Sequence, residues 1–456
     1  MKNLKLVVFG AGGSGVNVLE RVGEHVICLV DNDPKKQGTQ VKGKQVISPA
    51  ELKNYEFDAI VIGSIFVEEI KQQLIELGYE HKIALFNHSR ISAFRDDIDE
   101  LKLLSEDDLQ KPLLRTMHLN LTSACNIHCR TCRPDDFKYK ATYLDRPTIE
   151  KIVEDVFDEL THLRLDSSGE LTLSPHLEYV LEEATKRNIS IFISTNGTRI
   201  DEKFAELIVS STVETMQVSL DSPDKETNEW IRKGAKHEAI LQGAKNLVAA
   251  KKKLGKAYPE IHFHGAILQQ NIHQLKDMVQ LAHDIGINGV TLAYGFVHYY
   301  MDLSWSIFFD RELCNQKVQE AREHARKLGM FFNAPTPFNA PKDEKPKEKY
   351  CQYLFNWTYV DPSGQLFPCC TGAGEYVVGD AKTEKVSDIW KGERYQKLRE
   401  TYNTDQPEWD KCARCYMLSG WDADDYKVHF DPNHWPEVRQ RLAALENEQI
   451  ICRSAS

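Results

Sequence analysis

The sequence lacks any run of about 18 apolar residues, so it predicts no transmembrane helix. It also lacks basic charge: the formal net charge is −11 at pH 7, whereas a nucleic-acid binder needs a basic face. The first residues form an apolar strand and not the core of a signal peptide, so we expect a cytoplasmic protein. Eleven cysteines in such a chain predict metal ligation in a reducing compartment and argue against disulfides.

The composition is that of a soluble globular protein. Of the 456 residues, 41% are hydrophobic and 27% are charged, and the length suffices for two or three domains. Alternating apolar strands and amphipathic helices predict an α/β fold. We expect a module at 1–90, a linker at 91–113, a barrel at 114–332, a second linker at 333–350, a cysteine-containing domain at 351–420 and a tail at 421–456.

A loop with three cysteines organises the rest of the chain. Met117, Leu119 and Leu121 alternate as in a strand, and the strand leads into a C-x3-C-x2-C loop formed by Cys125, Cys129 and Cys132. Three thiolates on one short loop suit an iron–sulfur cluster with one iron left open for a ligand. The alternative is a zinc knuckle in which His128 supplies the fourth ligand.

This loop resembles the signature of the radical S-adenosylmethionine (radical SAM) superfamily. The resemblance implies a 4Fe–4S cluster whose open iron chelates S-adenosylmethionine, and reductive cleavage of that molecule to a 5′-deoxyadenosyl radical. It also implies an external electron donor such as flavodoxin or ferredoxin. Six predicted strands at 117–122, 162–166, 189–194, 215–220, 261–268 and 290–294 match the open, six-stranded partial (β/α)6 barrel of that superfamily.

Polar residues follow successive strands, and in parallel sheets such ends share one edge. We expect them to bind S-adenosylmethionine. The resemblance assigns the contact with its amino group to a segment that reads Ser168-Gly169-Glu170 here, with serine at the usual first glycine. Ser194, Asn196 and Ser219 suit ribose and methionyl contacts, and Arg232 suits the carboxylate. An aromatic loop at 294–309 follows the last strand and either covers the barrel mouth or packs on the C-terminal domain.

The N-terminal module begins with an apolar strand and a G-x-G-x-x-G loop, Gly10, Gly12 and Gly15, that enters a helix. A second strand ends at Asp31, in the place where an acid meets a ribose hydroxyl. The pattern resembles small Rossmann-like domains of sugar-nucleotide-processing enzymes. It predicts a nucleotide or nucleotide-sugar ligand, and the alternative is a scaffold that docks a partner.

A second cysteine set lies near the C-terminus and comprises Cys351, Cys369, Cys412 and Cys415. Four cysteines close a tetrahedral site for zinc or for an iron–sulfur cluster. The pattern resembles the SPASM/twitch extension of radical SAM enzymes and implies one auxiliary 4Fe–4S cluster. The layout is similar to that of 2-deoxy-scyllo-inosamine dehydrogenases, apart from the N-terminal module. Cys370 and Cys314 remain, each a candidate catalytic hydrogen donor or an ordinary free thiol.

Three functions compete. The first is a radical SAM oxidoreductase or epimerase that abstracts hydrogen from a carbohydrate, cyclitol or nucleotide-linked sugar. The second is a maturase that modifies a ribosomal peptide, although such enzymes usually carry a winged-helix module where this chain has a glycine loop. The third is a non-catalytic zinc-binding regulator, which would be colourless where an iron–sulfur protein is brown.

Overall fold

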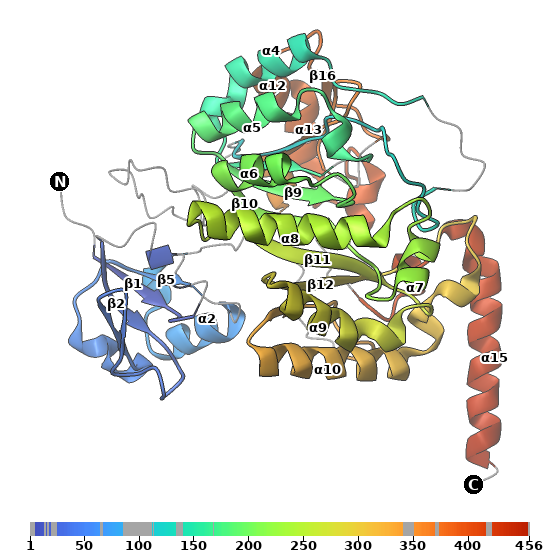
Figure 1. Cartoon of the computed structure of the whole chain (residues 1–456), viewed down its shortest axis with the longest axis horizontal. Coiled ribbons are helices and arrows are strands. Elements are labelled where there is room, and N and C mark those ends of the chain that lie inside the picture. The colour runs from blue at the N-terminus through green and yellow to red at the C-terminus, as the bar shows by residue number, and fades with distance from the viewer. Residues whose placement is uncertain are drawn as a thin grey trace. The chain divides into compact units, whose positions relative to one another are not determined.

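The structure is a computed structural model. It describes residues 5–12, 15, 18–19, 25–63, 67–84, 112, 114–133, 140–166, 168–340, 351–369, 374–415 and 422–454. The chain divides into two compact units, Met1–Pro112 and Leu113–Ser456 (Figure 1). Among the described residues, no helix is long and apolar enough to cross a membrane.

The first unit is built on a six-stranded sheet in the order β3-β4-β2-β1-β5-β6. Strands β1 (Leu6–Phe9), β2 (Val26–Val30), β4 (Lys44–Ile47), β5 (Ala59–Ile62) and β6 (Ile83–Ala84) run parallel, and β3 (Gln40–Val41) forms a hairpin with β4. Alternate residues of β1 face two separate apolar clusters. Both faces of the sheet are therefore covered, as the uninterrupted apolar strands predict. Helix α2 (Val67–Glu76) follows β5.

The second unit contains a ten-stranded sheet in the order β13-β12-β11-β10-β9-β8-β7-β14-β15-β16. The six predicted barrel strands are confirmed as β7 (Thr116–Leu119), β8 (His162–Leu165), β9 (Ser190–Thr195), β10 (Val213–Ser219), β11 (Glu260–Ile267) and β12 (Gly289–Tyr294). They are all parallel. Two further strands flank them, both parallel to their neighbours: β13 (Phe331–Asn333), which was not predicted, on one side and β14 (Trp357–Val360) on the other.

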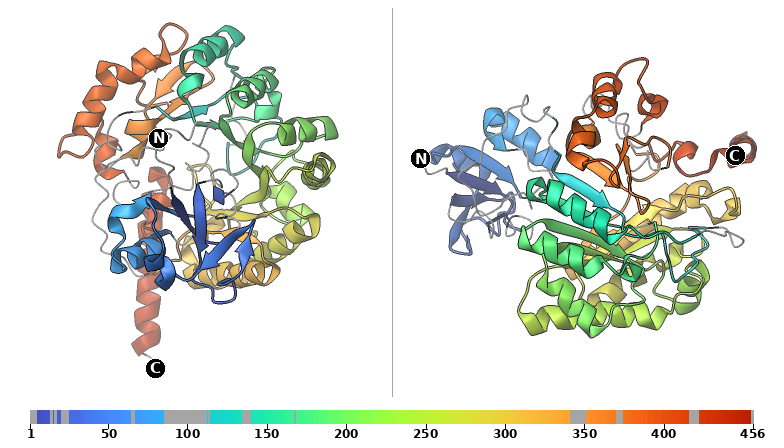
Figure 2. Two further views of the ribbon diagram at one scale, coloured as in Figure 1. Left: turned by 90° about the vertical axis from the view of Figure 1, so that its left-hand side faces the viewer. Right: turned by 90° about the horizontal axis from the view of Figure 1, so that it is seen from above.

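Helices cover one face of this curved sheet (Figures 1 and 2). They are α4 (Arg146–Val156), α5 (Leu177–Lys186), α6 (Glu202–Ser210), α8 (His237–Leu254), α9 (Leu275–Ile285) and α10 (Arg311–Leu328). A short helix, α7 (Lys225–Ile231), was not predicted. The apolar residues of the strands and helices join one core that includes Met117, Leu163, Ile191 and Val218. The other face of the strands carries the polar residues discussed below.

The segment with the second cysteine set continues the same sheet. Helix α11 (Gln352–Asn356) leads into β14, and β15 (Gln365–Phe367) and β16 (Gly379–Asp380) extend the edge as antiparallel strands. Helices α12 (Val386–Lys391) and α13 (Glu393–Thr401) follow, and α12 packs against α4. The hairpin that carries the auxiliary cysteines is thus bound through β14 to β7, the strand that precedes the three-cysteine loop.

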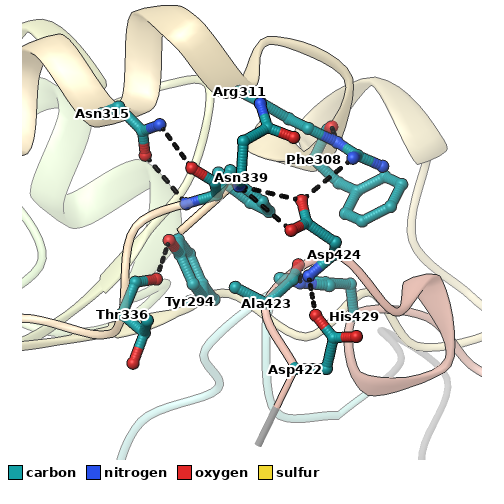
Figure 3. A network of polar contacts seen from close by, with 11 residues as sticks. Tyr294, Phe308, Arg311, Asn315, Thr336, Asn339, Asp422, Ala423, Asp424 and His429 are labelled. Atoms are coloured by element: carbon teal, nitrogen blue, oxygen red, sulfur yellow. Dashed lines mark hydrogen bonds and ion pairs between the residues drawn. The ribbon is translucent and has the colours of Figure 1, made fainter. Parts of the chain in front are cut away.

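The C-terminal segment is not a free tail where it is described. Phe430 and Val438 are fully buried, and Asp424 joins two other segments by accepting hydrogen bonds from Arg311 Nη1 (3.0 Å) and Asn339 N (3.0 Å) (Figure 3). Phe308 of the aromatic loop contacts the His429 and Phe430 rings. Of the two arrangements open for this loop, packing on the C-terminal segment is therefore realised. Helix α15 (Trp435–Ser454) ends the described chain.

Candidate active site

The three-cysteine loop lies at the carboxyl end of β7 and is held by backbone hydrogen bonds to the segment after α7. His128 N donates to Lys233 O (2.7 Å) and Arg130 N donates to Ile231 O (2.8 Å). Burial raises the pKa of the Cys125 thiol, and it raises the pKa of Cys129 to about 11. Cys132 also raises the pKa of each of these two thiols through its charge, so the three sulfurs lie close together. Among the described residues, no three Cys, His, Asp or Glu side chains form a site for a single metal ion.

The donor set fits a cluster. Three thiols on one short loop can ligate a cluster and leave one of its irons open to a second molecule. Gly234, with φ of +91°, packs against the loop, and a Cβ there would lie 3.6 Å from Ile127 Cα. Cys125, Cys129 and Cys132 would hold the cluster, which would supply one reducing electron to a bound sulfonium.

The turn after β8 packs directly on this loop. Glu170 N donates to Ala124 O at 2.6 Å. A Cβ on Gly169 would lie 2.1 Å from the same carbonyl oxygen, so only glycine allows the approach. Ser168, which stands where the resembling superfamily has glycine, accepts a hydrogen bond on Oγ from Asn120 Nδ2 at 3.1 Å.

Glu170 is buried and braces two strand ends. Its Oε1 accepts from Thr172 N (3.2 Å), Thr172 Oγ1 (2.8 Å) and Thr195 Oγ1 (2.7 Å), and its Oε2 accepts from Asn196 N (2.6 Å). The sequence predicted that this carboxylate accepts hydrogen bonds from the amino group of S-adenosylmethionine. Most of its acceptor capacity is used within the protein, and Oε2 is the oxygen with the fewer protein donors.

Asn196 reaches the cluster loop from the end of β9. Its Nδ2 donates to Asn126 Oδ1 (2.9 Å) and lies 4.0 Å from Cys125 Sγ. Its Oδ1 accepts from Thr198 N (3.0 Å). Ser194 lies two residues earlier on β9 and pairs in register with Gln217 of β10. Ser219, the last residue of β10, pairs with His264 of β11.

Arg232 forms a buried ion pair beside the cluster loop. Its Nε lies 2.8 Å from Asp221 Oδ2, with the Arg232 side chain 13% exposed and that of Asp221 3% exposed. Burial acts to lower the pKa of Arg232, but the Asp221 carboxylate and the nearby Cys129 thiol outweigh it and raise that pKa. Asp221 Oδ1 also accepts from Ala266 N at 2.7 Å. A ligand carboxylate at Arg232 would therefore share the guanidinium with Asp221.

A row of polar side chains lies on the sheet face away from the helices, and Ser194 is the member of it that the sequence predicted. Successive strands pair His118 with Arg164, Ser194 with Gln217, and His264 with Thr291. His118 Nε2 lies 3.1 Å from Asp166 Oδ1, and His264 Nδ1 lies 2.9 Å from Thr291 Oγ1. The signal was available in the sequence, because strands buried on both faces read as continuous apolar runs whereas these strands alternate.

The second cysteine set gathers around the β14–β15 hairpin. Cys351 precedes α11, Cys369 follows β15, and Cys412 and Cys415 lie in the turn after α13. Burial, together with the other cysteines of the set, raises the pKa of Cys351 to about 11 and that of Cys412 to about 12. The four thiols are thus close enough to interact, which fits an auxiliary cluster.

The two predicted catalytic cysteines, Cys370 and Cys314, are not linked to the cluster sites by the described contacts. Cys370 lies outside the described residues. Cys314 is fully buried on α10, and burial raises the pKa of its thiol to about 12. The contacts of the described chain do not bring Cys314 to either cysteine set. A catalytic role for either residue stays a prediction.

In the first unit, the glycine loop has the expected close packing. A Cβ on Gly15 would lie 1.7 Å from Gly10 O, whereas a Cβ on Gly12 would meet nothing within 4 Å. Asp31, expected to meet a ribose, instead accepts from Ala11 N (2.8 Å) and Asp33 N (2.9 Å) and pairs with Lys36 Nζ (3.1 Å). These donors hold its pKa below the usual range although burial opposes them. Nucleotide binding at this loop stays a prediction.

A cavity of about 220 Å³ lies between the three-cysteine loop and the β14–β15 hairpin. Its walls come from the loop, the turn after β8 and the hairpin. They are Ser123, Thr142, Ser168, Tyr359, Asp361, Pro362, Ser363, Phe367 and Gly374.

Comparison with known proteins agrees with this geometry. Residues 119–282 match the Radical SAM superfamily, residues 351–416 match the SPASM iron–sulfur cluster-binding domain, and residues 2–84 match the C2185-like N-terminal domain. The tungsten-containing aldehyde ferredoxin oxidoreductase cofactor-modifying protein of Pyrococcus furiosus is 22% identical over 74% of this chain and 96% of its own length. The PqqA peptide cyclase of Granulibacter bethesdensis is 25% identical over 69% of this chain and 87% of its own.

Among solved structures, Streptococcus suis SuiB has a similar fold. Its complexes with the precursor peptide SuiA and with S-adenosylmethionine give TM-scores of 0.52 and 0.51 at 16% identity. The matches cover 77% and 78% of this chain and 82% of SuiB. The chain is therefore a radical SAM enzyme with a C-terminal SPASM domain, and these two domains imply S-adenosylmethionine and 4Fe–4S clusters, one of them auxiliary.

Proposed function

We propose that the enzyme modifies a peptide, by abstracting a hydrogen atom from one of its residues. The observation that carries the proposal is the similarity to a peptide cyclase over 87% of that relative's length. The fold shared with SuiB, which was solved with a precursor peptide, is in keeping with it. The second candidate substrate is a peptide-derived or other small cofactor, because one relative is a cofactor-modifying protein.

The cavity has room for part of a peptide. It holds about 220 Å³ and is open to the surface, so an amino-acid side chain fits inside it while the rest of the peptide lies outside.

A sugar nucleotide at the N-terminal module was predicted to contact Asp31 through its ribose. The carboxylate is already engaged by Ala11 N, Asp33 N and Lys36. A ribose hydroxyl would have to displace one of these donors. The carbohydrate hypothesis therefore keeps no specific support from the described residues.

Each group of site residues has its own role in the proposed reaction. When bound, the cluster and S-adenosylmethionine supply a 5′-deoxyadenosyl radical that takes the hydrogen atom. Asn196, Arg232 and the turn at Ser168–Glu170 would hold S-adenosylmethionine at the strand ends, as expected for a parallel barrel. The auxiliary cysteines would hold a second cluster, which would accept an electron from the substrate radical. An external flavodoxin or ferredoxin would provide the reducing electron.

Anaerobic turnover tests the proposal. The reduced enzyme would be incubated with S-adenosylmethionine and synthetic peptides encoded near its gene, and separately with sugar nucleotides and cyclitols. We expect 5′-deoxyadenosine and a change in peptide mass in the first reactions. Deuterium placed in the peptide should appear in the deoxyadenosine. Deuterium transfer from a sugar or cyclitol, with none from any peptide, would overturn the peptide assignment.

A further inference from the structure

A polar bridge connects the end of β7 with the turn after β8 and with β14. The Asn120 side chain at its centre is fully buried, and its Nδ2 donates to Tyr359 Oη at 2.8 Å and to Ser168 Oγ at 3.1 Å. The two N–H groups of this amide thus donate to two hydroxyls from distant parts of the chain. Ser168 itself is exposed. Tyr359 is 7% exposed, so water has little access to its contact with Asn120.

One end of the bridge is attached to the cluster loop. Ser168 precedes Gly169, where a Cβ would lie 2.1 Å from Ala124 O. The Arg133 guanidinium donates to Ser168 O (2.8 Å) and to Ser123 O (3.1 Å). A displacement of Ser168 would therefore move the turn proposed to meet S-adenosylmethionine.

The other end is attached to the auxiliary site. Tyr359 lies on β14, between Cys351 and Cys369 in the chain, and its ring packs against Phe367 with centroids 5.8 Å apart. Phe367 is two residues before Cys369. A cluster held by four cysteines cross-links both ends of this hairpin to the turn at 412–415, and such a cross-link restricts the conformations of the segment it closes.

We propose that Asn120 transmits the state of the auxiliary site to the binding of S-adenosylmethionine, with Tyr359 and Ser168 as its two contacts. The hairpin, when fixed by its cluster, holds the Tyr359 hydroxyl on Asn120, and Asn120 holds the turn at Ser168. Ser168 Oγ supplies the acceptor for the second amide proton, and a glycine at this position would offer none. All three are positioning residues, and the inference does not depend on the substrate proposed above.

Two single variants test the bridge. In Tyr359→Phe, Asn120 loses one acceptor, and we expect roughly fivefold weaker binding of S-adenosylmethionine, as for one lost hydrogen bond. Ser168→Ala should have a similar effect, and the two together should not be additive. Affinity would be measured by anaerobic equilibrium dialysis on protein with both clusters reconstituted, with iron content and thermal unfolding recorded for each variant.

The matched control is Tyr395→Phe. Its buried hydroxyl contacts the same strand from the other face, through Thr358 Oγ1 at 2.8 Å. This variant removes a buried hydroxyl near the hairpin and leaves the bridge intact. We expect its affinity for S-adenosylmethionine to match that of the wild type.

The coupling itself is tested by removing the auxiliary cluster. Cys412→Ala should weaken S-adenosylmethionine binding in the wild-type background and have little further effect in Tyr359→Phe, because the route is already broken. Equal weakening in both backgrounds would overturn the proposal. Wild-type affinity in Tyr359→Phe protein with full iron content would overturn it as well.

Discussion

Arg232 Nε lies 2.8 Å from Asp221 Oδ2, and this ion pair is buried within electrostatic range of Cys129. The backbone on either side of Arg232 holds the three-cysteine loop, through Ile231 O and Lys233 O. The pair therefore fixes the segment that supports the cluster and also presents the one buried guanidinium assigned to S-adenosylmethionine.

We expect Asp221→Asn to lower the free energy of unfolding by about 3–5 kcal/mol, because it leaves a buried guanidinium without its counter-charge. Urea unfolding of the cluster-free protein would measure the loss. Glu206→Gln is the matched control, since Glu206 pairs with Lys253 at 2.6 Å on the surface, where the side chains are 39% and 65% exposed. Exposed pairs contribute about 0–1 kcal/mol. Equal losses in both variants would contradict the structural role given to Asp221.

Gly169→Ala should detach the turn after β8 from the cluster loop. The new Cβ would lie 2.1 Å from Ala124 O and 2.5 Å from Ser123 C, so backbone must move on one side. Overpacking of this kind costs about 1–3 kcal/mol, and here the strain falls on the loop of Cys125. We expect reduced iron content and at least tenfold slower formation of deoxyadenosine. A tenfold lower rate corresponds to an activation free energy higher by about 1.4 kcal/mol.

Gly12→Ala provides the control for that variant. A Cβ at Gly12 meets no heavy atom within 4 Å, and the residue lies in the first unit. Its iron content and rate should equal those of the wild type. Normal iron loading in Gly169→Ala would show that the turn does not support the loop.

The cysteine motifs and the barrel strands could be predicted because their signals are local. The spacing of Cys125, Cys129 and Cys132 fits one loop, and six apolar strands alternate with helices. The strand at Trp357–Val360 carries an equally apolar run, but its parallel pairing with β7 joins residues some 240 positions apart. Nothing local to either strand specifies that partner. The bridge from Asn120 to Tyr359 depends on the same pairing and was missed for the same reason.

Other parts of the site were foreseen in position but not in their partners. Asp31 lies at the end of β2 as expected, yet its carboxylate binds Ala11 of the glycine loop. Glu170 follows β8 as expected, yet it receives donors from β9. A sequence pattern identifies an acceptor at a strand end, whereas its donor depends on which neighbouring turn reaches it. The buried segment around Phe430 has no periodic pattern at all, so only tertiary packing reveals it.

His429 should make the protein sensitive to mild acid. Burial is the main cause that lowers its pKa from 6.5 to about 4. Arg311 acts in the same direction, whereas the contact with Ala423 O and the carboxylates of Asp425 and Asp424 oppose it. Because the folded pKa lies below the unfolded one, the unfolded state binds more protons between these values. This contribution to stability is complete above about pH 6.5 and is lost as the pH falls towards 4, by on the order of 3 kcal/mol.

His429→Gln should reduce that pH dependence, since glutamine can still donate to Ala423 O and does not titrate. Urea unfolding at pH 7.5, 6, 5 and 4.5 would measure it. His262, whose pKa burial also lowers to about 4, should keep part of the acid sensitivity in the variant. An unchanged slope with pH in His429→Gln would show that His429 is not buried in its neutral form.

Iron counting separates the two cysteine sets and tests the metal that each holds. Two 4Fe–4S clusters correspond to about eight iron atoms per chain, with brown colour. Cys412→Ala should lower the count to about four and reduce the absorbance in proportion, because three thiols hold the auxiliary cluster less firmly than four. Cys370→Ala serves as the control and should keep about eight, since Cys370 is not among the four proposed ligands. Zinc in place of iron, lost from Cys412→Ala without a change in colour, would instead identify the second set as a structural zinc site.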